Sequence, residues 1–276
     1  MIIANTIAEC RAHRRSLGKL AFVPTMGALH AGHVSLMTLA KQHAPSVAVS
    51  IFVNPTQFAP TEDFGKYPRP LDADLQQCQA AGVDLVFLPS PEEIYPPGSP
   101  EFVVDLPALT TVLEGAHRPT HFRGVCQVVA KLFNIVQPDV AIFGQKDFQQ
   151  LRVLTAMVEA LDFLIQIIPG PTLREPGGLA MSSRNQYLSA DDRQRALSIS
   201  RGLFRAEAEV KRDVRDTAAL IALIRDEITG QGLSIDYVAA VDPTTFVPVD
   251  RVAGPTVLAV AARVGKTRLI DNVVVD

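Results

Sequence analysis

Short, continuously apolar runs alternate with longer amphipathic stretches over residues 1–170 of the 276-residue chain. Runs that are apolar at every position predict strands buried on both faces, whereas apolar residues three or four apart predict helices. The predicted strands lie at 20–23, 47–53, 83–88, 140–143 and 163–168, and the predicted helices at 33–44, 72–81, 124–136 and 148–161. This alternation predicts an α/β fold, a Rossmann-like parallel sheet with helices on both faces, in which ligands bind at the carboxyl ends of the strands.

A turn-rich segment, residues 169–178, interrupts this pattern with several prolines and glycines. The stretches beyond it predict two helices, at 190–211 and 217–229, and strands within 234–241 and 257–275. We therefore expect residues 1–172 to form a catalytic domain that binds the ligands. Residues 173–276 are expected to form a smaller C-terminal α+β domain.

Composition and charge exclude several kinds of protein. The net charge of −3 provides no positive field for nucleic acid. No apolar run approaches the roughly 18–20 residues that a membrane span needs, and the first residues lack the charged and apolar regions of a secretory signal. The three cysteines have no C-x-x-C spacing, which fits reduced thiols and not a disulfide framework or a zinc site. We expect a cytoplasmic protein with small-molecule ligands that binds neither nucleic acid nor membranes.

The segment PTMGALHAGH, residues 24–33, is the clearest functional signal. It joins a predicted strand to a predicted helix, and His30 and His33 can face the same side of the helix start. The free N–H groups there favour a phosphate, and Gly32 lets it approach the backbone. Imidazole donors could then stabilise charge on an α-phosphate during nucleotidyl transfer. Two histidines that only cap a helix are the alternative, while zinc is disfavoured because it would need a third protein ligand.

Polar residues also follow the strand predicted at 47–53. Asn54 and Gln57 lie in the segment FVNPTQF, where their amides could hydrogen-bond a hydroxy-acid substrate. The alternative is an ordinary polar turn after a strand.

A third polar segment, FGQKDFQQ, follows the strand predicted at 140–143. Lys146 stands between a strand end and a helix start, a good place for a cation on ATP phosphates. Asp147 could bind ribose or help to hold the nucleotide, and Gln150 could face the substrate one turn later. The alternative for Lys146 and Asp147 is a solvated ion pair worth under ~1 kcal/mol.

The segment MSSRN, residues 181–185, follows the proposed domain boundary. Its two serine hydroxyls and the guanidinium of Arg184 are suited to binding phosphate. From this position the C-terminal domain could close over a nucleotide. A serine cluster that caps a helix is the alternative.

Together these segments resemble the pantothenate synthetase family. PTMGALHAGH, FVNPTQF, RPTHFRGV, FGQKDFQQL and LAMSSRNQYL occur in the order and at the spacing of that family, and the resemblance covers residues 20–190. The H-x-G-H pattern also resembles the HIGH signature of nucleotidylyltransferases and class I aminoacyl-tRNA synthetases.

The resemblance implies an amide-forming ligase that condenses (R)-pantoate with β-alanine at the expense of ATP. The products would be pantothenate, AMP and pyrophosphate, formed through a pantoyl-adenylate with Mg²⁺ on the phosphates, in a homodimer. The implied catalytic residues are His30, His33, Lys146 and Arg184. The implied substrate-binding residues are Asn54, Gln57, Val128, Val129 and Gln150. The implied ATP-binding residues are Met26, Gly27, Ala28, Leu29, His30, Ala31, Gly32, His33, Gly144, Gln145, Lys146, Asp147, Leu173, Met181, Ser182, Ser183 and Arg184.

Two positions depart from the pattern of the family. It commonly has Glu where this chain has Gln145, and an Asp-Gly pair where this chain has Gly177-Gly178. Neither position is expected to take part in the chemistry, and no protein side chain is assigned to a metal. Another H-x-G-H nucleotidylyltransferase and a non-catalytic ATP-binding module are the alternative functions.

Overall fold

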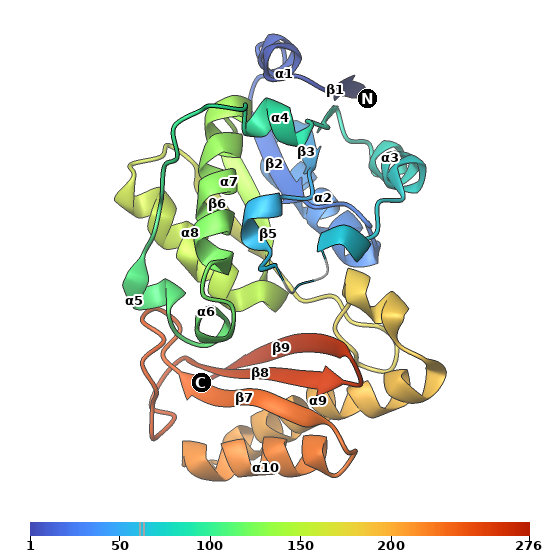
Figure 1. Cartoon of the computed structure of the whole chain (residues 1–276). Coiled ribbons are helices and arrows are strands. Elements are labelled where there is room, and N and C mark those ends of the chain that lie inside the picture. Colours follow the sequence, from blue (N-terminus) through green and yellow to red (C-terminus); the bar gives the residue numbers. More distant parts are fainter. Residues whose placement is uncertain (61, 63) are drawn as a thin grey trace.

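A six-stranded parallel sheet forms the larger part of the protein (Figure 1). The computed structural model describes residues 1–60, 62 and 64–276. The strands lie in the order β1-β4-β3-β2-β5-β6. Their bounds are Ile2–Ala4 for β1, Leu20–Thr25 for β2, Ser46–Ile51 for β3, Leu85–Phe87 for β4, Val140–Gly144 for β5 and Gln166–Gly170 for β6.

Helices cover both faces of this sheet, as the continuously apolar strands predict. Along β2, Leu20 and Phe22 pack into a core with α1, α7 and α8, whereas Ala21 and Val23 pack into a second core with α2 and α3. The bounds of these helices are Ile7–Arg14 for α1, Ala31–His43 for α2, Leu71–Ala80 for α3, His121–Val136 for α7 and Phe148–Ala160 for α8. Short helices and 3₁₀ turns occupy the connections, with bounds Pro91–Ile94 for α4, Pro107–Thr110 for α5, Glu114–His117 for α6, Pro55–Gln57 for η1, Phe64–Lys66 for η2, Gln145–Asp147 for η3 and Ser183–Tyr187 for η4. The predicted Rossmann-like sheet is confirmed.

The direction in which the chain adds strands reverses between β2 and β5. From β2 the chain proceeds through β3 and β4 toward one edge of the sheet, while β5 and β6 extend toward the other edge. The loops that leave β2 and β5 therefore diverge at the carboxyl end of the sheet. A reversal of this kind opens a crevice, which is where open α/β sheets bind ligands.

The C-terminal part forms a second, antiparallel sheet in the order β7-β8-β9. Its elements are α9 (Ala190–Lys211), α10 (Thr217–Thr229), β7 (Ser234–Val241), β8 (Thr256–Val264) and β9 (Thr267–Val275). Along β8, Leu258 and Val260 pack in one core with α9 and α10, whereas Val257 and Ala259 pack in the core of the larger sheet. The small sheet is therefore layered between its own helices and the rest of the protein (Figure 1). The predicted α+β character is confirmed, and the boundary at residues 172/173 stays a prediction.

Two details differ from the sequence-based expectation. The strand predicted at 163–168 is shifted toward the C-terminus, as β6, because Asp162 has a left-handed φ of 51° that prolongs the turn after α8. The N-terminal elements β1 and α1 were not predicted. β1 has three residues, too few to show a periodic pattern, and it forms by pairing in parallel with β4.

Candidate active site

One cavity lies at the carboxyl end of the sheet, in the crevice between the loops after β2 and β5. Its volume is about 240 Å³, and it brings together residues from all four polar segments singled out in the sequence. The predicted site residues that line it are Met26, His30, Gly32, His33, Asn54, Gln57, Val128, Val129, Gly144, Lys146, Asp147, Gln150, Leu173, Met181, Ser182, Ser183 and Arg184. The predicted residues outside its lining are Gly27, Ala28, Leu29, Ala31 and Gln145.

His30 and His33 stand at the start of α2 with their ring centroids 4.1 Å apart. His30 is the N-cap residue, and its Nδ1 accepts a hydrogen bond from the backbone N–H of Gly32 at 3.1 Å. Nδ1 of His33 accepts from the backbone N–H of His30 at 3.2 Å. A Cβ at position 32 would lie 2.9 Å from Nδ1 of His30, so the glycine makes room for the imidazole that caps the helix. Gly32 therefore accommodates the ring of His30, a role that differs from the predicted approach of a phosphate to the backbone.

These hydrogen bonds define the protonation of both imidazoles. Because a backbone N–H can only donate, each Nδ1 must be an unprotonated acceptor, which places the proton of each neutral ring on Nε2. Burial, followed by the positive charge of Lys146, lowers the pKa of His30 to about 4. Burial, followed by the proximity of His30, lowers the pKa of His33 to about 3. At neutral pH the pair therefore consists of uncharged rings, each with an Nε2–H to donate.

The backbone of the first loop is held from behind by Asp74 on α3. Its Oδ2 accepts from the N–H of Ala28 at 2.9 Å and its Oδ1 from the N–H of Leu29 at 2.7 Å. The loop needs this support because Ala28 has a φ of 50°, in the left-handed region that costs a residue with a side chain about 1–3 kcal/mol. Gly27, with a φ of 83°, passes so close to Asp74 that a Cβ would lie 2.9 Å from Oδ2. Burial raises the pKa of Asp74. No local pattern in the sequence marks this residue as part of the site.

Asn54 is almost entirely buried, with 1% of its surface exposed. Its Nδ2 donates to Oε1 of Gln57 at 3.1 Å and to the carbonyl of Gly124 at 3.0 Å. Its Oδ1 accepts from the hydroxyls of Tyr95 and Thr56, at 2.9 and 3.0 Å. These bonds engage both the donors and the acceptor of the amide. Asn54 therefore orients Gln57, and substrate could bind to it directly only by displacing one of these partners.

Gln57 is consequently fixed with its amide nitrogen toward the loop after β2, where Nε2 lies 2.9 Å from Sδ of Met26. A close approach between η1 and α7 completes this part of the site. A Cβ at Gly124 would overlap the carbonyl of Thr56, so only glycine allows this contact.

An apolar wall faces these amides. Val128 and Val129 on α7 are each 5% exposed and line the cavity. Val125 and Leu132 of the same helix extend this wall. A ligand in this part of the cavity would place polar groups against Gln57 and alkyl groups against α7.

Lys146 enters the cavity from the 3₁₀ turn η3, directly after β5. Its Nζ lies 3.8 Å from Oδ1 of Asp147, a separation too long for a tight ion pair, and its side chain is 18% exposed. Asn272 on β9 donates from Nδ2 to the carbonyls of Gln145 and Lys146, at 3.0 and 2.9 Å. The turn that carries the lysine is therefore held from the C-terminal sheet.

The opposite wall comes from the segment between β6 and α9. The backbone N–H of Met181 donates to the carbonyl of Leu173 at 3.0 Å, so the two residues close the ends of a hairpin-like loop. Ser182 caps η4 by accepting from the N–H of Arg184 at 3.2 Å. This is the helix cap that the sequence offers as the alternative to phosphate binding. Ser182, Ser183 and Arg184 nevertheless also line the cavity.

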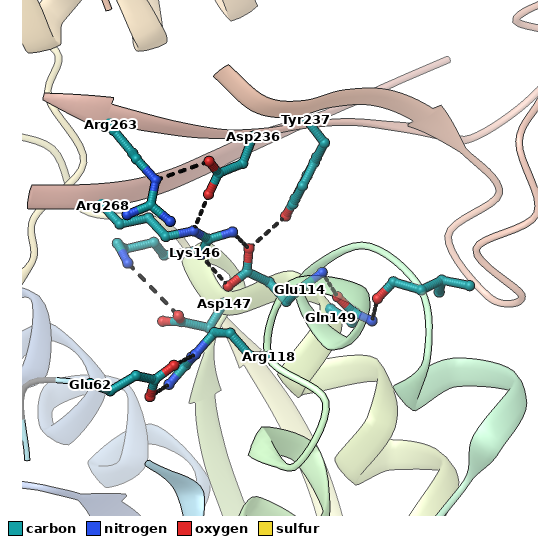
Figure 2. Close-up of polar contacts among 11 residues, drawn as sticks. Glu62, Glu114, Arg118, Lys146, Asp147, Gln149, Asp236, Tyr237, Arg263 and Arg268 are labelled. Carbon is teal, nitrogen blue, oxygen red and sulfur yellow. Dashed lines mark hydrogen bonds and ion pairs between the residues drawn. The ribbon is translucent and has the colours of Figure 1, made fainter. Parts of the chain in front are cut away.

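Other lining residues carry charge or aromatic surface but have no predicted role, although some lie in the segment RPTHFRGV. Arg118 donates from Nε and Nη2 to both carboxylate oxygens of Glu62, at 2.7 and 2.8 Å (Figure 2). Nδ1 of His121 lies 3.0 Å from the carbonyl of Gln57 and must donate to it, which leaves Nε2 unprotonated in the neutral ring. Burial lowers the pKa of His121 to about 4, and the charge of Arg118 contributes. Further lining residues without a predicted role are Thr25, Phe52, Phe58, Tyr67 and Thr172.

Fold and cavity together define a class: α/β proteins whose ligand site lies at the switch point of a Rossmann-like sheet, here lined by Lys146 and Arg184. Residues 2–274 match the family model described as pantoate-beta-alanine ligase. The pantothenate synthetases of Thermobifida fusca and Chloroflexus aurantiacus are both 50% identical to this chain over 99% of its length, and the matches cover 95% and 97% of those proteins.

Two solved structures are similar over almost the whole chain. The pantothenate synthetase of Thermus thermophilus has a TM-score of 0.94 and 42% identity, with 99% of both chains covered. The pantoate-beta-alanine ligase of Francisella tularensis, in a complex with beta-gamma ATP and beta-alanine, has a TM-score of 0.84 and 36% identity, with 99% of this chain and 97% of that one covered. The chain belongs to the pantoate–β-alanine ligase family, whose members join pantoate to β-alanine to make pantothenate.

Proposed function

We propose that the cavity binds ATP, pantoate and β-alanine and that the ligation proceeds through a pantoyl-adenylate. One observation carries this proposal. Two neutral imidazole donors, at His30 and His33, share one cavity with the cation of Lys146, the amide of Gln57 and the apolar wall of α7. The imidazoles and the lysine suit phosphates, while the amide and the apolar wall suit a hydroxy acid with alkyl substituents.

In the first step, a carboxylate oxygen of pantoate attacks the α-phosphorus of ATP. The bond from that phosphorus to the bridging oxygen breaks, and pyrophosphate leaves with the bonding electrons. The protein has to align the two anions and to stabilise the charge that develops on the phosphate oxygens. The Nε2–H groups of His30 and His33 would donate to these oxygens, and Lys146 and Arg184 would contribute positive charge.

In the second step, the amine of β-alanine attacks the acyl carbon of the adenylate. The bond between this carbon and the phosphate oxygen breaks, AMP leaves, and one proton is released from the nitrogen. The mixed anhydride is already activated, so no covalent bond to the protein is needed. Gln57 and Gln150 would position pantoate for both steps, and Gln57 would also lie near β-alanine.

Mg²⁺ bound to the phosphates would neutralise part of their charge. Within the described residues, no group of three His, Cys, Asp or Glu side chains converges on a common point. Asp147, whose side chain is 48% exposed, is the only carboxylate among the described lining residues. The phosphates would therefore supply most ligands of the ion, with room for a single protein carboxylate.

Pantoate labelled with ¹⁸O in its carboxylate provides the sharpest test. Attack by the carboxylate on the α-phosphorus predicts that one labelled oxygen appears in AMP and none in pyrophosphate. Pyrophosphate release should require pantoate and should become multiple-turnover only when β-alanine is added. Label in inorganic phosphate would indicate an acyl phosphate instead, and AMP without label would exclude the adenylate.

The same proposal includes the cytoplasm as the location and a homodimer as the assembly. The three cysteines are all buried and unpaired, which fits a reducing compartment. No helix within the described part of the chain is long and apolar enough to cross a bilayer. Ile2 and Ile3 on the edge strand β1 are 38% and 42% exposed, and a partner subunit could cover them. Light scattering on the purified chain tests the dimer.

A further inference from the structure

Two consecutive residues of the C-terminal sheet, Asp271 and Asn272 on β9, contact both loops that flank the cavity. They are 4% and 7% exposed, and neither lines the cavity itself. Their side chains point in different directions, as consecutive residues of a strand must. One side chain reaches the turn that carries Lys146, and the other reaches the loop that carries Leu173 and Met181.

Asn272 fixes the turn of Lys146 on both sides of that residue's α-carbon. Its single amide nitrogen donates to the carbonyl of Gln145 at 3.0 Å and to the carbonyl of Lys146 at 2.9 Å. Both hydrogens of the amide are used on two consecutive peptide units. The turn joins β5 directly to α8, so any rotation of these peptides would redirect the lysine ammonium.

Asp271 fixes the opposite loop through Arg174. The carboxylate accepts from Nη1 at 2.6 Å and from Nη2 at 3.0 Å, the bidentate geometry that most restricts a guanidinium. Arg174 also donates to the carbonyl of Gly178 at 3.1 Å and lies 4.8 Å above the ring of Phe204. The arginine is thereby held within the loop, whose two ends are Leu173 and Met181 at the cavity.

The two residues of β9 are also joined to each other, because the N–H of Asn272 donates to Oδ1 of Asp271 at 2.8 Å. A shift of one anchor is therefore transmitted to the other. We propose that Asp271 and Asn272 are positioning residues that set the distance between the Lys146 turn and the Leu173–Met181 loop across the phosphate end of the cavity. This inference rests on the proposed function in one respect, the role of Lys146 at the phosphates.

A double-mutant cycle between Asn272 and Lys146 tests the inference. Pantoate-dependent exchange of pyrophosphate into ATP is measured for the wild type, Asn272→Ala, Lys146→Ala and the double variant. Because a displacement of about 1 Å can cost up to 10²-fold in rate, we expect Asn272→Ala to lower kcat/KM for ATP at least about tenfold. In the Lys146→Ala background the same change should cost less than about threefold, since no lysine remains to be positioned.

Two variants separate positioning from packing and from general stability. Asn272→Asp keeps the shape of the side chain but turns acceptors toward two carbonyls, so we expect it to lose at least as much activity as Asn272→Ala. Gln149→Ala is the matched control. Gln149 also donates to two backbone carbonyls, those of Leu109 and Val112 at 2.8 Å each, and is 6% exposed. The Gln149→Ala variant should have a Tm lowered about as much as that of Asn272→Ala, while its kcat/KM for ATP stays within about threefold of the wild type.

The outcomes distinguish the inference from the proposed function. Equal losses from Asn272→Ala in both backgrounds, near-normal kinetics of Asn272→Asp, or an equal rise of KM for ATP in Gln149→Ala would each overturn the positioning role. Near-normal kinetics of Lys146→Ala would overturn the proposed role of Lys146 and the inference with it. Should Asn272→Ala fail to fold, Asn272→Ser completes the cycle, with all rates taken well below the Tm of each variant.

Discussion

Glu114 joins the two sheets of the protein through a buried ion pair with Arg268 (Figure 2). Glu114 lies on α6, and its carboxylate accepts from Nη1 and Nη2 of Arg268 on β9, at 2.7 and 2.6 Å. It also accepts from the hydroxyl of Tyr237 on β7 at 3.0 Å. Arg268 donates from Nε to Asp236 at 2.6 Å, so the guanidinium lies between two carboxylates. The side chain of Glu114 is 8% exposed.

Replacement of Glu114 by alanine should strongly destabilise the folded state. Removal of one partner from a buried pair costs about 3–5 kcal/mol, because the other charge loses its compensation. Arg268 keeps Asp236, which places the expected loss at the lower end, about 3 kcal/mol. In a chain of this size each kcal/mol lowers Tm by about 2–4 °C, so we expect a decrease of about 6–12 °C.

Calorimetry or thermal circular dichroism measures this difference, and Glu159→Ala is the control. Glu159 pairs with Arg152 at 3.6 Å, but its side chain is 64% exposed, so loss of this pair should cost less than about 1 kcal/mol. If Glu114→Ala shifts Tm no more than Glu159→Ala does, the buried pair does not contribute to stability and the reasoning is refuted.

The same pair predicts how the difference depends on pH. Burial raises the pKa of Glu114, but the hydrogen bonds and the charge of Arg268 outweigh burial and hold the pKa below its ordinary value of 4.5. A carboxyl whose pKa is lower in the folded state contributes fully above its unfolded pKa and loses that contribution as the pH falls through the folded value. The Tm difference between wild type and Glu114→Ala should therefore be constant near neutral pH and shrink below pH 4.5.

Further predictions concern the cavity. His33→Ala should lower turnover at least about 10²-fold, the usual cost of one well-placed transition-state donor, with an unchanged circular dichroism spectrum; turnover near the wild-type value would exclude the role given to His33. Since burial lowers the pKa of His30 to about 4 and of His33 to about 3, the pH–rate profile should show no imidazole inflection near 6.5, and an inflection there that disappears in His33→Ala would contradict the neutral pair. Arg184→Ala should raise KM for ATP and lower kcat, and unchanged steady-state kinetics would remove Arg184 from the site. Asp74→Asn turns an amide N–H₂ toward one of two buried backbone donors, which should cost about 1–3 kcal/mol of stability and lower turnover through the shifted loop; a denaturation midpoint and turnover equal to the wild type would contradict this support.

The sheet and the four polar segments could be predicted from the sequence because both depend on local patterns. Only the loop of residues 26–30 separates the strand β2 from the helix α2, and His30 and His33 lie at the start of that helix. The carboxyl ends of parallel strands meet at one edge of a sheet, so segments after different strands are brought together without further information. This is why Gln57 and Lys146 could be expected at one site.

Other parts of the site depend on contacts that no local pattern specifies. Asn272 binds the carbonyl of Lys146 from 126 residues away in sequence, and Asp74 binds the N–H of Leu29 from 45 residues away. Both contacts are made to backbone atoms, which any residue carries, so the partner position leaves no mark in the sequence. The hydrogen bond between Asn54 and Tyr95 joins two side chains, but it too links residues 41 positions apart that only the folded chain brings together.

The neutral state of the histidines has a consequence for how an acidic protein binds a polyanionic substrate. With His30 and His33 uncharged, the proposed function requires Lys146 and Arg184, on either side of the cavity, to supply the protein's positive charge to the phosphates. Lys146 follows β5 of the large sheet, whereas Arg184 lies beyond β6 in the segment that leads to the C-terminal helices. The distance between the two cations therefore depends on how the two sheets are docked. Since the pair of Glu114 and Arg268 stabilises that docking, its loss should raise KM for ATP at temperatures at which the protein is still folded.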